Sequence, residues 1–419
     1  MTDPRRRAIL TAGAGAALAS GATALATPAS AKKGKSDSVL ERPFGLVGDG
    51  KADDTEALQR VFEAAFSGDD AELVTLPPGN YRLTRPIRIQ TKTRPDGNIT
   101  HPAGIRADGA SLLSEIEDGE PMIDIDVRAT LRFFRIEGLH LAGRGKEGTG
   151  LRISCQRRGT YFYNFCIRDC AIEGCGNNGC ELVGNFFEGQ IINCYFRDNG
   201  RDGARFAHGA EDTVFSAVHT FGSVFGGNHR NGVSIEDGAA DVSFHGCYFL
   251  LNGMFGLSAE TGVTLLSHCG FENNHERAES FDKGDAGLRL MVGGTLVGCT
   301  AYSIRKQRYL VRAYVSNNLT MIGCSGSGDQ DASSAKLAKL GGEDEAAFTL
   351  IGCRGGVEKK DGAAPVEFGN GEGLSFGASW DSANQLTLGD YHFWVDNQGN
   401  LRSTRGRPQG DEDGSIVGT

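Results

Sequence analysis

The stretch Ile191-Ile192-Asn193-Cys194-Tyr195-Phe196-Arg197-Asp198-Asn199-Gly200-Arg201-Asp202-Gly203 contains the unit that decides the fold. A cysteine follows an apolar pair and one glycine, asparagine or aspartate position, and an aromatic residue, an asparagine and a glycine stand two, five and nine positions after the cysteine. From Cys170 onward the unit recurs at spacings of 24, 29, 24, 22, 30, 25 and 29 residues. Such a period predicts a solenoid, because each repeat buries its apolar side against its neighbours. The cysteine slot is held by Leu139 in the opening copy and then by Cys170, Cys194, Ser223, Cys247, Cys269, Cys299, Cys324 and Cys353.

The apolar pattern inside each unit has a period of two residues, which indicates β-strands. Since alternate side chains of a strand share a face, the cysteine slot and the residue two positions later point to the same side. Aromatic residues dominate the second of these positions, so we expect this side of the strand to face the core. The asparagines predict a ladder at a turn, where stacked side chains bond neighbouring backbones and tolerate left-handed conformations. The core row is Ile172, Phe196, Phe225, Phe249 and Phe271; the asparagine row is Asn199, Asn228, Asn252 and Asn274; the glycine row is Gly179, Gly203, Gly232 and Gly256.

Three segments before the repeats carry a resemblance to a known family. Residues 44–55 read FGLVGDGKADDT, residues 57–65 read ALQRVFEAA and residues 74–81 read VTLPPGNY. Together they closely resemble the amino-terminal signature of the pectate-lyase-like superfamily, a group of lyases, polygalacturonase-like hydrolases, epimerases and phage tailspikes. The resemblance implies an all-β fold, a single-stranded right-handed parallel β-helix with an amino-terminal capping helix. It is specific for the fold and says little about the reaction.

The helix expected in this signature has a physical role. Asp53, Asp54 and Thr55 suit a helix start, and the residues after them form one apolar stripe. Such a helix can cover the first coil of a solenoid, which would otherwise expose its core. Asp49 together with Asp53 and Asp54 could also suggest a metal site, but the stripe begins immediately after them and favours capping. The stripe consists of Leu58, Val61, Phe62 and Ala65.

Composition and charge exclude several classes of protein. The 419 residues carry 43 Lys and Arg against 53 Asp and Glu, a formal net charge of −10, so we expect no nucleic-acid partner. The 61 glycines indicate a turn-rich chain, and 11 prolines with 23% charged residues argue against disorder. No later segment offers the ~20 apolar residues of a membrane span.

The chain divides into four predicted segments. Residues 1–31 resemble a twin-arginine-type signal peptide: Arg5-Arg6-Arg7 precede a mild apolar run, and Ala29-Ser30-Ala31 fits a cleavage site. An ordinary secretory signal is the alternative, and either predicts a periplasmic or secreted protein. We expect a linker at 32–42, the parallel β-helix at 43–375 and a carboxy-terminal β-hairpin tail at 376–419, with strands around Trp394 to Arg402.

Eleven cysteines in an exported protein ordinarily suggest disulfides, but the repeat places most of them in one slot. We therefore predict a ladder of small buried thiols. Disulfides remain the alternative, since neighbouring coils about 4.8 Å apart could bring some pairs within reach. Cys155, Cys166, Cys175 and Cys180 lie off the ladder, where one pair could be oxidised.

The turn after the asparagine row predicts the functional site. Read down the stack, it gathers a basic strip on an acidic protein, which suits an anionic polysaccharide whose carboxylates repeat along a line. The catalytic candidates are His229 as a base, held by Asp202 and flanked by Arg230, for β-elimination from a uronic acid. The substrate-binding candidates are Arg201, His275, Arg277, Arg305 and Lys306, with Tyr161 and Tyr163 expected to line the same groove.

Other interpretations stay open at this point. A polygalacturonase-like hydrolase needs paired carboxylates, which are not evident in these turns. A non-catalytic carbohydrate-binding or structural β-helix, or a solvated turn without a ligand, would show the same strip. Calcium is a conceivable cofactor, and the carboxylates in the two insertions, Glu211 and Asp212 in one and Asp282 and Asp285 in the other, match no particular metal site. A homo-oligomer is also conceivable.

Overall fold

The structure is a computed structural model. It describes residues 43–66, 73–91, 103–210, 212–261, 263–275, 286–303, 307, 309–315, 319–328, 336–342, 348–359, 366–368, 386–388, 391–396, 398, 400–405, 409–410 and 412–417. The predicted signal peptide and linker lie outside these residues, and their assignment stays a prediction. In the described part of the chain, no helix is both long enough and apolar enough to cross a membrane.

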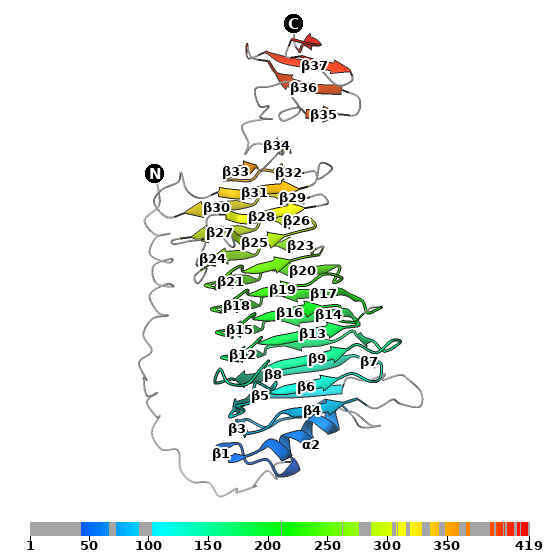
Figure 1. Ribbon diagram of the computed structural model, residues 1–419, viewed down its shortest axis with the longest axis vertical. Coiled ribbons are helices and arrows are strands. Elements are labelled where there is room, and N and C mark those ends of the chain that lie inside the picture. The colour runs from blue at the N-terminus through cyan, green and yellow to red at the C-terminus, as the bar shows by residue number, and fades with distance from the viewer. Residues whose placement is uncertain are drawn as a thin grey trace, which may run out of the picture. The chain divides into compact units, whose positions relative to one another are not determined.

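Parallel strands stack coil upon coil into a right-handed parallel β-helix, as the resemblance implied (Figure 1). Each coil adds one strand to each of two ladders of a 23-stranded sheet and then one strand to an 11-stranded sheet. Phe196 pairs with Phe225 in the second ladder, and Phe225 pairs with Phe249, so the core row predicted from the sequence stacks in register. All three side chains are fully buried, which confirms that this row faces the core.

The strands fall into groups by their place in the coil. The first ladder, before the cysteine slot, contains β2 (Leu73–Thr75), β5 (Ala103–Ser114), β8 (Phe134–Ala142), β11 (Cys166–Arg168), β14 (Phe186–Ile192), β17 (Phe215–Phe221), β20 (Val242–His245), β23 (Val263–Ser267), β26 (Gly294–Val297), β29 (Leu319–Ile322), β32 (Phe348–Ile351) and β34 (Val366–Phe368). The second ladder, after the slot, contains β1 (Asp49–Asp53), β3 (Gly79–Leu83), the ends of β5 and β8, β12 (Ala171–Glu173), β15 (Tyr195–Arg197), β18 (Val224–Gly226), β21 (Tyr248–Leu250), β24 (Gly270–Glu272), β27 (Thr300–Ser303) and β30 (Ser325–Gly328).

The 11-stranded sheet follows the asparagine turn and carries the site described below. Two further strands, β7 (Leu131–Arg132) and β10 (Phe162–Tyr163), pair beside the first ladder. The strands of the 11-stranded sheet are β4 (Ile87–Gln90), β6 (Ile123–Asp126), β9 (Leu151–Cys155), β13 (Cys180–Gly184), β16 (Ala204–Ala207), β19 (Val233–Ile235), β22 (Leu257–Ala259), β25 (Ala286–Leu290), β28 (Tyr309–Val315), β31 (Lys336–Gly342) and β33 (Gly356–Lys359).

The cysteine slot lies at the bend between the first and second ladders. The residue before the slot has a left-handed backbone, with φ of 52° at Asn193 and 60° at Gly246, which explains why glycine, asparagine and aspartate occupy it. Each slot thiol donates to the backbone of the preceding coil, as Cys194 Sγ does to Ile167 O at 3.6 Å. All eleven cysteines are free, so the ladder of thiols is confirmed and the disulfide alternative is wrong.

The asparagine row forms a continuous hydrogen-bonded ladder, as predicted. Asn199 Nδ2 donates to Asn228 Oδ1 at 2.9 Å, and Asn228 Nδ2 donates to Asn252 Oδ1 at 3.0 Å. Gln307 stands eight positions after Cys299 instead of five and continues the ladder by accepting from Asn274 Nδ2 at 3.1 Å, because inserted residues shift its coil. The left-handed conformation belongs to the residue before each asparagine, such as Leu251 with φ of 56°, so assigning it to the asparagines is wrong.

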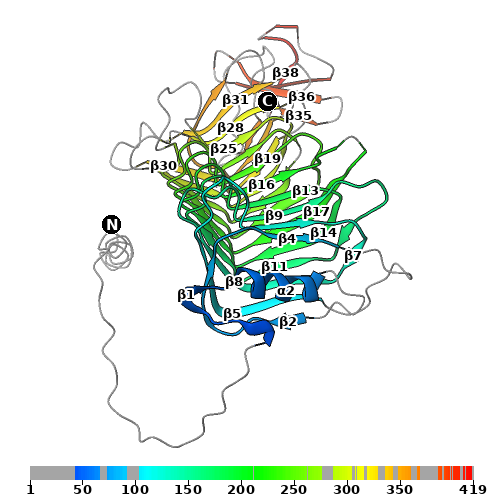
Figure 2. The ribbon, with the colours of Figure 1, turned by 60° about the horizontal axis from the view of Figure 1, so that its bottom comes forward.

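The helix α2 (Thr55–Phe66) lies across the first coils, beside the start of β4 and β5 (Figures 1 and 2). Its apolar stripe is buried, and the Phe66 ring lies 4.0 Å from the ring of Phe134. Gln59 bonds the edge strand β4 through its amide, which donates to Arg88 O at 2.8 Å and accepts from Arg88 N at 3.0 Å. The predicted capping helix is therefore confirmed. A short 3-10 helix, η1 (Pro43–Gly45), precedes it.

The acidic residues of the amino-terminal signature act as local caps. Asp54 accepts from the backbone amides of Val47 and Gly48, at 2.6 and 3.1 Å. Asp53 accepts from Thr55 N at 3.0 Å, and Asp49 accepts from the amides that follow it. Their lone pairs are thus used by the fold at the helix start, which supports the capping interpretation.

The carboxy-terminal strands form a separate antiparallel sheet of β35 (Leu386–Leu388), β36 (Tyr391–Val395), β37 (Leu401–Arg405) and β38 (Ser415–Ile416). Trp394 pairs with Arg402 in the β36–β37 hairpin, where the sequence predicted strands. Asp396 closes the turn by accepting from Arg402 Nε at 2.6 Å, which lowers the pKa of Asp396 to about 2.

Candidate functional site

The turn that follows the asparagine row stacks as the sequence predicted. Arg201 N donates to Asn177 O at 3.0 Å, and Arg230 N donates to Arg201 O at 2.8 Å, so the two arginines occupy equivalent places on neighbouring coils. Arg201 and His229 are exposed. The structure therefore brings Arg201, His229 and Arg230 to one turn surface.

Asp202 has a different place from the one expected for a partner of His229. Its side chain is fully buried, and its carboxylate accepts from Arg230 Nε at 2.9 Å and Arg230 Nη2 at 2.5 Å. It also accepts from Asn231 N of the next coil at 3.0 Å. In this respect Asp202 resembles the asparagines of the ladder, whose side chains bond a neighbouring coil. Asp202 thus anchors Arg230 by a bidentate ion pair, because a buried carboxylate requires a close cation.

The remaining members of the predicted strip are less accessible or lie outside the described residues. His275 is 1% exposed, so it is not on the surface where a substrate would meet it, and placing it in an open strip is wrong. Its backbone has φ of 78°, and its amide donates to Asn252 O of the preceding coil at 2.8 Å. Arg277, Arg305 and Lys306 fall outside the described residues, and their roles stay predictions.

A cavity of about 200 Å³ opens on the outer face of the 11-stranded sheet, beside the turn surface. Arg230 lines one side and Arg289 the other, and Phe255 and Met254 supply an apolar wall. Two small side chains, Ser234 of β19 and Ser258 of β22, form part of the lining between them. The remaining lining residues are Asn231, Ile235, Glu236 and Glu260.

Glu236 and Glu260 enter this cavity from adjacent coils. They follow Ile235 and Ala259, which are partners in the parallel ladder, and Glu260 N donates to Ile235 O at 2.9 Å. Neighbouring parallel strands lie about 4.8 Å apart, so the two carboxylates line one groove. We call the cavity with these two glutamates and with Arg230 and Arg289 the carboxylate groove.

The two glutamates have different environments. Glu236 accepts from Arg205 Nε at 2.7 Å and from Arg205 Nη2 at 2.6 Å, and these bonds hold the pKa of Glu236 below its usual value. Arg230 and Arg201 lower that pKa further through their charge. Glu260 is more open: its side chain is 53% exposed and lies 3.7 Å from Arg289. One carboxylate is thus fixed in its ionised form, and the other can meet a ligand.

A row of charged side chains extends along the outer face of the same sheet. Arg152 pairs with Asp124 at 2.6 Å, and Arg205 reaches both Glu181 and Glu236. From Arg289 of the groove onward the row has cations on three successive strands, since Arg289 pairs in register with Arg312, and Arg312 with Lys339; Glu358 follows on the next strand. Cations repeating at about the strand spacing of 4.8 Å can bind a linear polyanion.

Sequence reasoning missed Glu236 and Glu260, although the signal was present. Both stand 13 positions after the slot, at Ser223 and Cys247 respectively. The predicted rows end at the glycine nine positions after the slot, before the strands of the 11-stranded sheet. Extending them by four positions would have paired the two glutamates.

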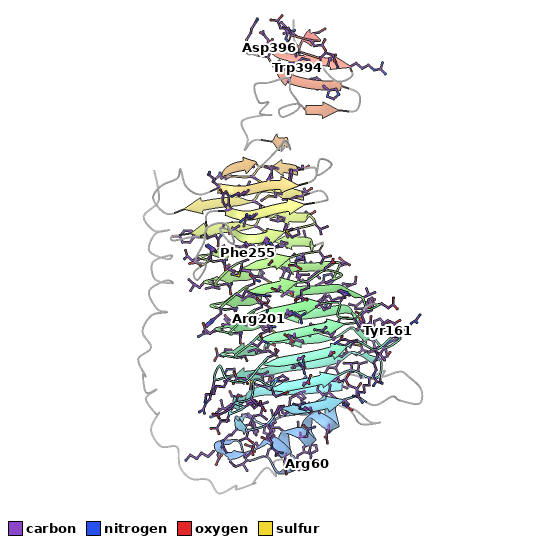
Figure 3. All side chains as sticks on the ribbon, in the orientation of Figure 1. Arg60, Tyr161, Arg201, Phe255, Trp394 and Asp396 are labelled. Atoms are coloured by element: carbon purple, nitrogen blue, oxygen red, sulfur yellow. The ribbon has the colours of Figure 1, made fainter. Side chains whose placement is uncertain are left out.

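Tyr161 and Tyr163 do not join the turn surface. Figure 3 shows Tyr161 and Arg201 at opposite sides of the β-helix, with Phe255 of the cavity on the side of Arg201. Tyr163 belongs to β10, next to the first ladder, and not to the 11-stranded sheet. The expectation that these tyrosines line the same groove as the arginine strip is therefore wrong.

The described residues contain no cluster of three or more histidine, cysteine, aspartate or glutamate side chains that could hold a metal ion. Of the insertion carboxylates considered for calcium, Asp212 is exposed, whereas Glu211, Asp282 and Asp285 lie outside the described residues. Calcium dependence stays a prediction.

Comparison with solved structures supports the fold. The chain is similar to ORF18 of Geobacillus virus E2, with 17% identity and a TM-score of 0.59 over 89% of this chain and 74% of that one. It is also similar to the enzymatically active domain of tailspike protein 2 from bacteriophage CBA120, with 12% identity and a TM-score of 0.51 over 74% of this chain and 46% of that one. Identities this low establish the fold alone.

Comparison with family models identifies the lineage. A model described as capsule depolymerase matches residues 358–419. Among curated proteins, no sequence matches the chain. The model described as rhamnogalacturonase A/epimerase, pectate lyase-like matches residues 39–263, more than half of the 419 residues. With its coils, its capping helix and this match, the chain belongs to the rhamnogalacturonase A/epimerase, pectate lyase-like family.

Proposed function

We propose that the protein is an exported enzyme that cleaves an anionic polysaccharide in the carboxylate groove. The observation that carries the proposal is that two glutamates and two arginines from successive coils line one cavity on the outer face of the 11-stranded sheet. The family name, with its reference to rhamnogalacturonase, and the capsule depolymerase match both support a polysaccharide as the substrate.

Hydrolysis is the reaction that this arrangement supports best. Glycoside hydrolases use two carboxyl groups that flank the scissile bond. Glu236, which Arg205 keeps ionised, is suited to accept a proton from water or to attack the anomeric carbon. Glu260, on the neighbouring coil and open to the groove, is the second carboxyl group and takes the role of the general acid that protonates the leaving oxygen, so that water is consumed and one new reducing end forms. Arg230 and Arg289 would bind the carboxylates of the sugar chain.

Elimination is the second candidate, and the exposed turn surface favours it. His229 lies on this surface beside Arg230, and a lyase needs a base near a cation that neutralises the uronate. In this reaction the base removes the C5 proton, the glycosidic oxygen leaves from C4, and an unsaturated sugar end forms without water. The two reactions therefore give different products.

The test is to incubate the purified mature protein with rhamnogalacturonan, polygalacturonate and alginate, with calcium and with a chelator. We expect new reducing ends without the ultraviolet absorbance of unsaturated uronates. If that absorbance rises, elimination replaces hydrolysis, and loss of the rise in His229→Ala would assign the base. If neither signal appears with any of the three, the proposed activity is refuted in favour of a binding or structural β-helix.

Export remains part of the proposal. A polysaccharide substrate lies outside the cytoplasm, which agrees with the signal sequence expected over residues 1–31. Comparing the amino-terminal residue of the protein recovered from the periplasm or medium with Lys32 would test the cleavage site.

A further inference from the structure

The short strands β7 and β10 build an extra ladder beside the first one. Leu131, Phe162, Phe186 and Phe215 pair across successive coils, and all four side chains are buried. Because side chains alternate along a strand, the next residue on each coil points outward. This outer row consists of Arg132, Tyr163, Phe187 and Ser216.

Aromatic rings gather on this outer face. Tyr161 lies 5.4 Å from Tyr163 and 5.8 Å from Phe187, and Tyr163 lies 5.5 Å from Phe187, all measured between ring centroids. The Arg132 guanidinium lies 5.1 Å from the centroid of the Tyr163 ring. We call these four residues the aromatic platform. The three rings are half-buried and Arg132 is exposed, so the platform offers both ring surface and charge to solvent.

The core does not require these rings. The inner row already fills the interior, where Phe162 and Phe186 lie 5.5 Å apart. Ring pairs contribute about 0.5–1.5 kcal/mol beyond their burial, which is a small gain for three rings that stay partly open to solvent. The outer rings pack on one another and leave ring surface that a ligand can contact.

The size and charge of the platform favour a sugar chain over a second protein. Half of three rings at about 200 Å² each is about 300 Å², well below the ~800 Å² that each partner buries in a stable protein interface. The flat C–H face of a pyranose ring packs on an aromatic ring, and a guanidinium binds the carboxylate of an acidic sugar. Exposed Arg157 and Arg158, in the loop that leads to Tyr161, add positive charge nearby.

We infer that the aromatic platform is a second binding site for an acidic glycan, separate from the carboxylate groove. The inference rests on the proposed function for the class of ligand. The coil of β14 continues into β16, which is the neighbour of β19 in the 11-stranded sheet. The platform and the groove are thus within about 15 Å along the stacking axis, a few strand spacings. The two sites also lie on different sides of the coil (Figure 3), so a polysaccharide chain that follows the coil surface from one to the other can bind at both and stay bound between cleavages.

The experiment measures binding of polygalacturonate, alginate and rhamnogalacturonan to the full chain by affinity electrophoresis. It uses a Glu260→Gln background so that the polymer is not cut. Tyr163→Ala and Phe187→Ala should each weaken binding of at least one polymer by about tenfold. Tyr248→Ala is the matched control, because Tyr248 is 58% exposed on β21 and lies outside the platform. Circular dichroism confirms that each variant folds.

The outcomes separate the platform from the groove. With Glu260 restored, Tyr163→Ala should raise KM for the polymer and leave kcat for a short oligosaccharide unchanged. Equal binding by Tyr163→Ala and Tyr248→Ala, or no binding of any of the three polymers, would overturn the inference. So would a change of oligomeric state in Tyr163→Ala at unchanged glycan affinity. Cleavage of short oligosaccharides in any of these cases would leave the proposed function standing.

Discussion

The asparagine ladder should determine the stability of the coil stack, and Asn228→Ala tests this. Asn228 is fully buried and makes four side-chain hydrogen bonds. Its Oδ1 accepts from Asn199 N and Nδ2, at 3.2 and 2.9 Å, and its Nδ2 donates to Phe196 O and Asn252 Oδ1, both at 3.0 Å. Alanine removes all four bonds and cannot bond to the groups left behind.

The expected loss follows from those partners. At a net ~1 kcal/mol for each bond, Asn228→Ala should lower the free energy of unfolding by about 4 kcal/mol. Leaving a single buried donor such as Asn199 N without an acceptor already costs about 1–3 kcal/mol, and the other lost bonds add to that cost. A loss of about 4 kcal/mol in the free energy of unfolding is rare for a single substitution, and it points to a specific cause such as a broken network of buried hydrogen bonds.

The assay is urea unfolding followed by far-ultraviolet circular dichroism. Gln190→Ala is the control, because it removes an amide of similar chemistry from an exposed position of β14. We expect Gln190→Ala to change the free energy of unfolding by less than about 0.5 kcal/mol. If Asn228→Ala destabilises the protein no more than this control, the ladder is not what holds the coils together.

Three further predictions concern packing, thiols and pH. Gly203→Ala should destabilise the fold strongly, since a Cβ there would lie 2.6 Å from Gly232 O; thermal melting against Gly410→Ala, which meets open space, checks this. Native protein should react slowly with a thiol reagent and show all eleven thiols only after unfolding, because most of the thiols are buried and burial raises the pKa of Cys155 to about 11 and that of Cys175 and Cys180 further; a mass that reveals disulfides would contradict it. Arg205 holds the pKa of Glu236 below the ordinary ~4.3, so the acidic limb of cleavage should lie at lower pH than for a free glutamate. Arg205→Gln removes that bond and raises the pKa of Glu236, which should move the limb to higher pH in a pH–rate profile; an unchanged limb would separate Glu236 from catalysis.

The fold could be predicted from the sequence because a solenoid repeats its constraints. Each coil needs a small residue at the bend, an aromatic residue two positions later and an asparagine at the next turn, so Cys194, Phe196 and Asn199 recur as a pattern. Because the same local constraints act in every coil, the same residue types recur in the sequence at a regular spacing. The capping helix was also visible, because its apolar stripe begins directly after a capping motif.

The site could be predicted only in part, because it depends on differences between coils. The stacking of Arg201 and Arg230 followed from the period, but the burial of Asp202 did not. The spacing of a residue from the cysteine slot gives its place along the coil stack. Its exposure depends in addition on whether the backbone directs its side chain outward or inward. His275 was misplaced because its position in the row does not show that its side chain is buried.

The aromatic cluster was misplaced for a different reason. Tyr161 and Tyr163 follow an irregular loop after β9, and no period relates that loop to the turns. The sequence showed the two tyrosines together but not the side of the coil to which they belong. The register of β10 with β14 provides that information.

The central claim is that catalysis takes place in the carboxylate groove, and the most direct measurement compares cleavage rates of Glu236→Gln and His229→Gln with the wild-type rate. The substrate and pH are the same for all three proteins, and circular dichroism verifies folding. The account predicts a loss of about 10²–10⁴-fold for Glu236→Gln, with His229→Gln close to wild type. A Glu236→Gln variant that cleaves at the wild-type rate, or a loss confined to His229→Gln, would contradict it and move the chemistry to the turn surface.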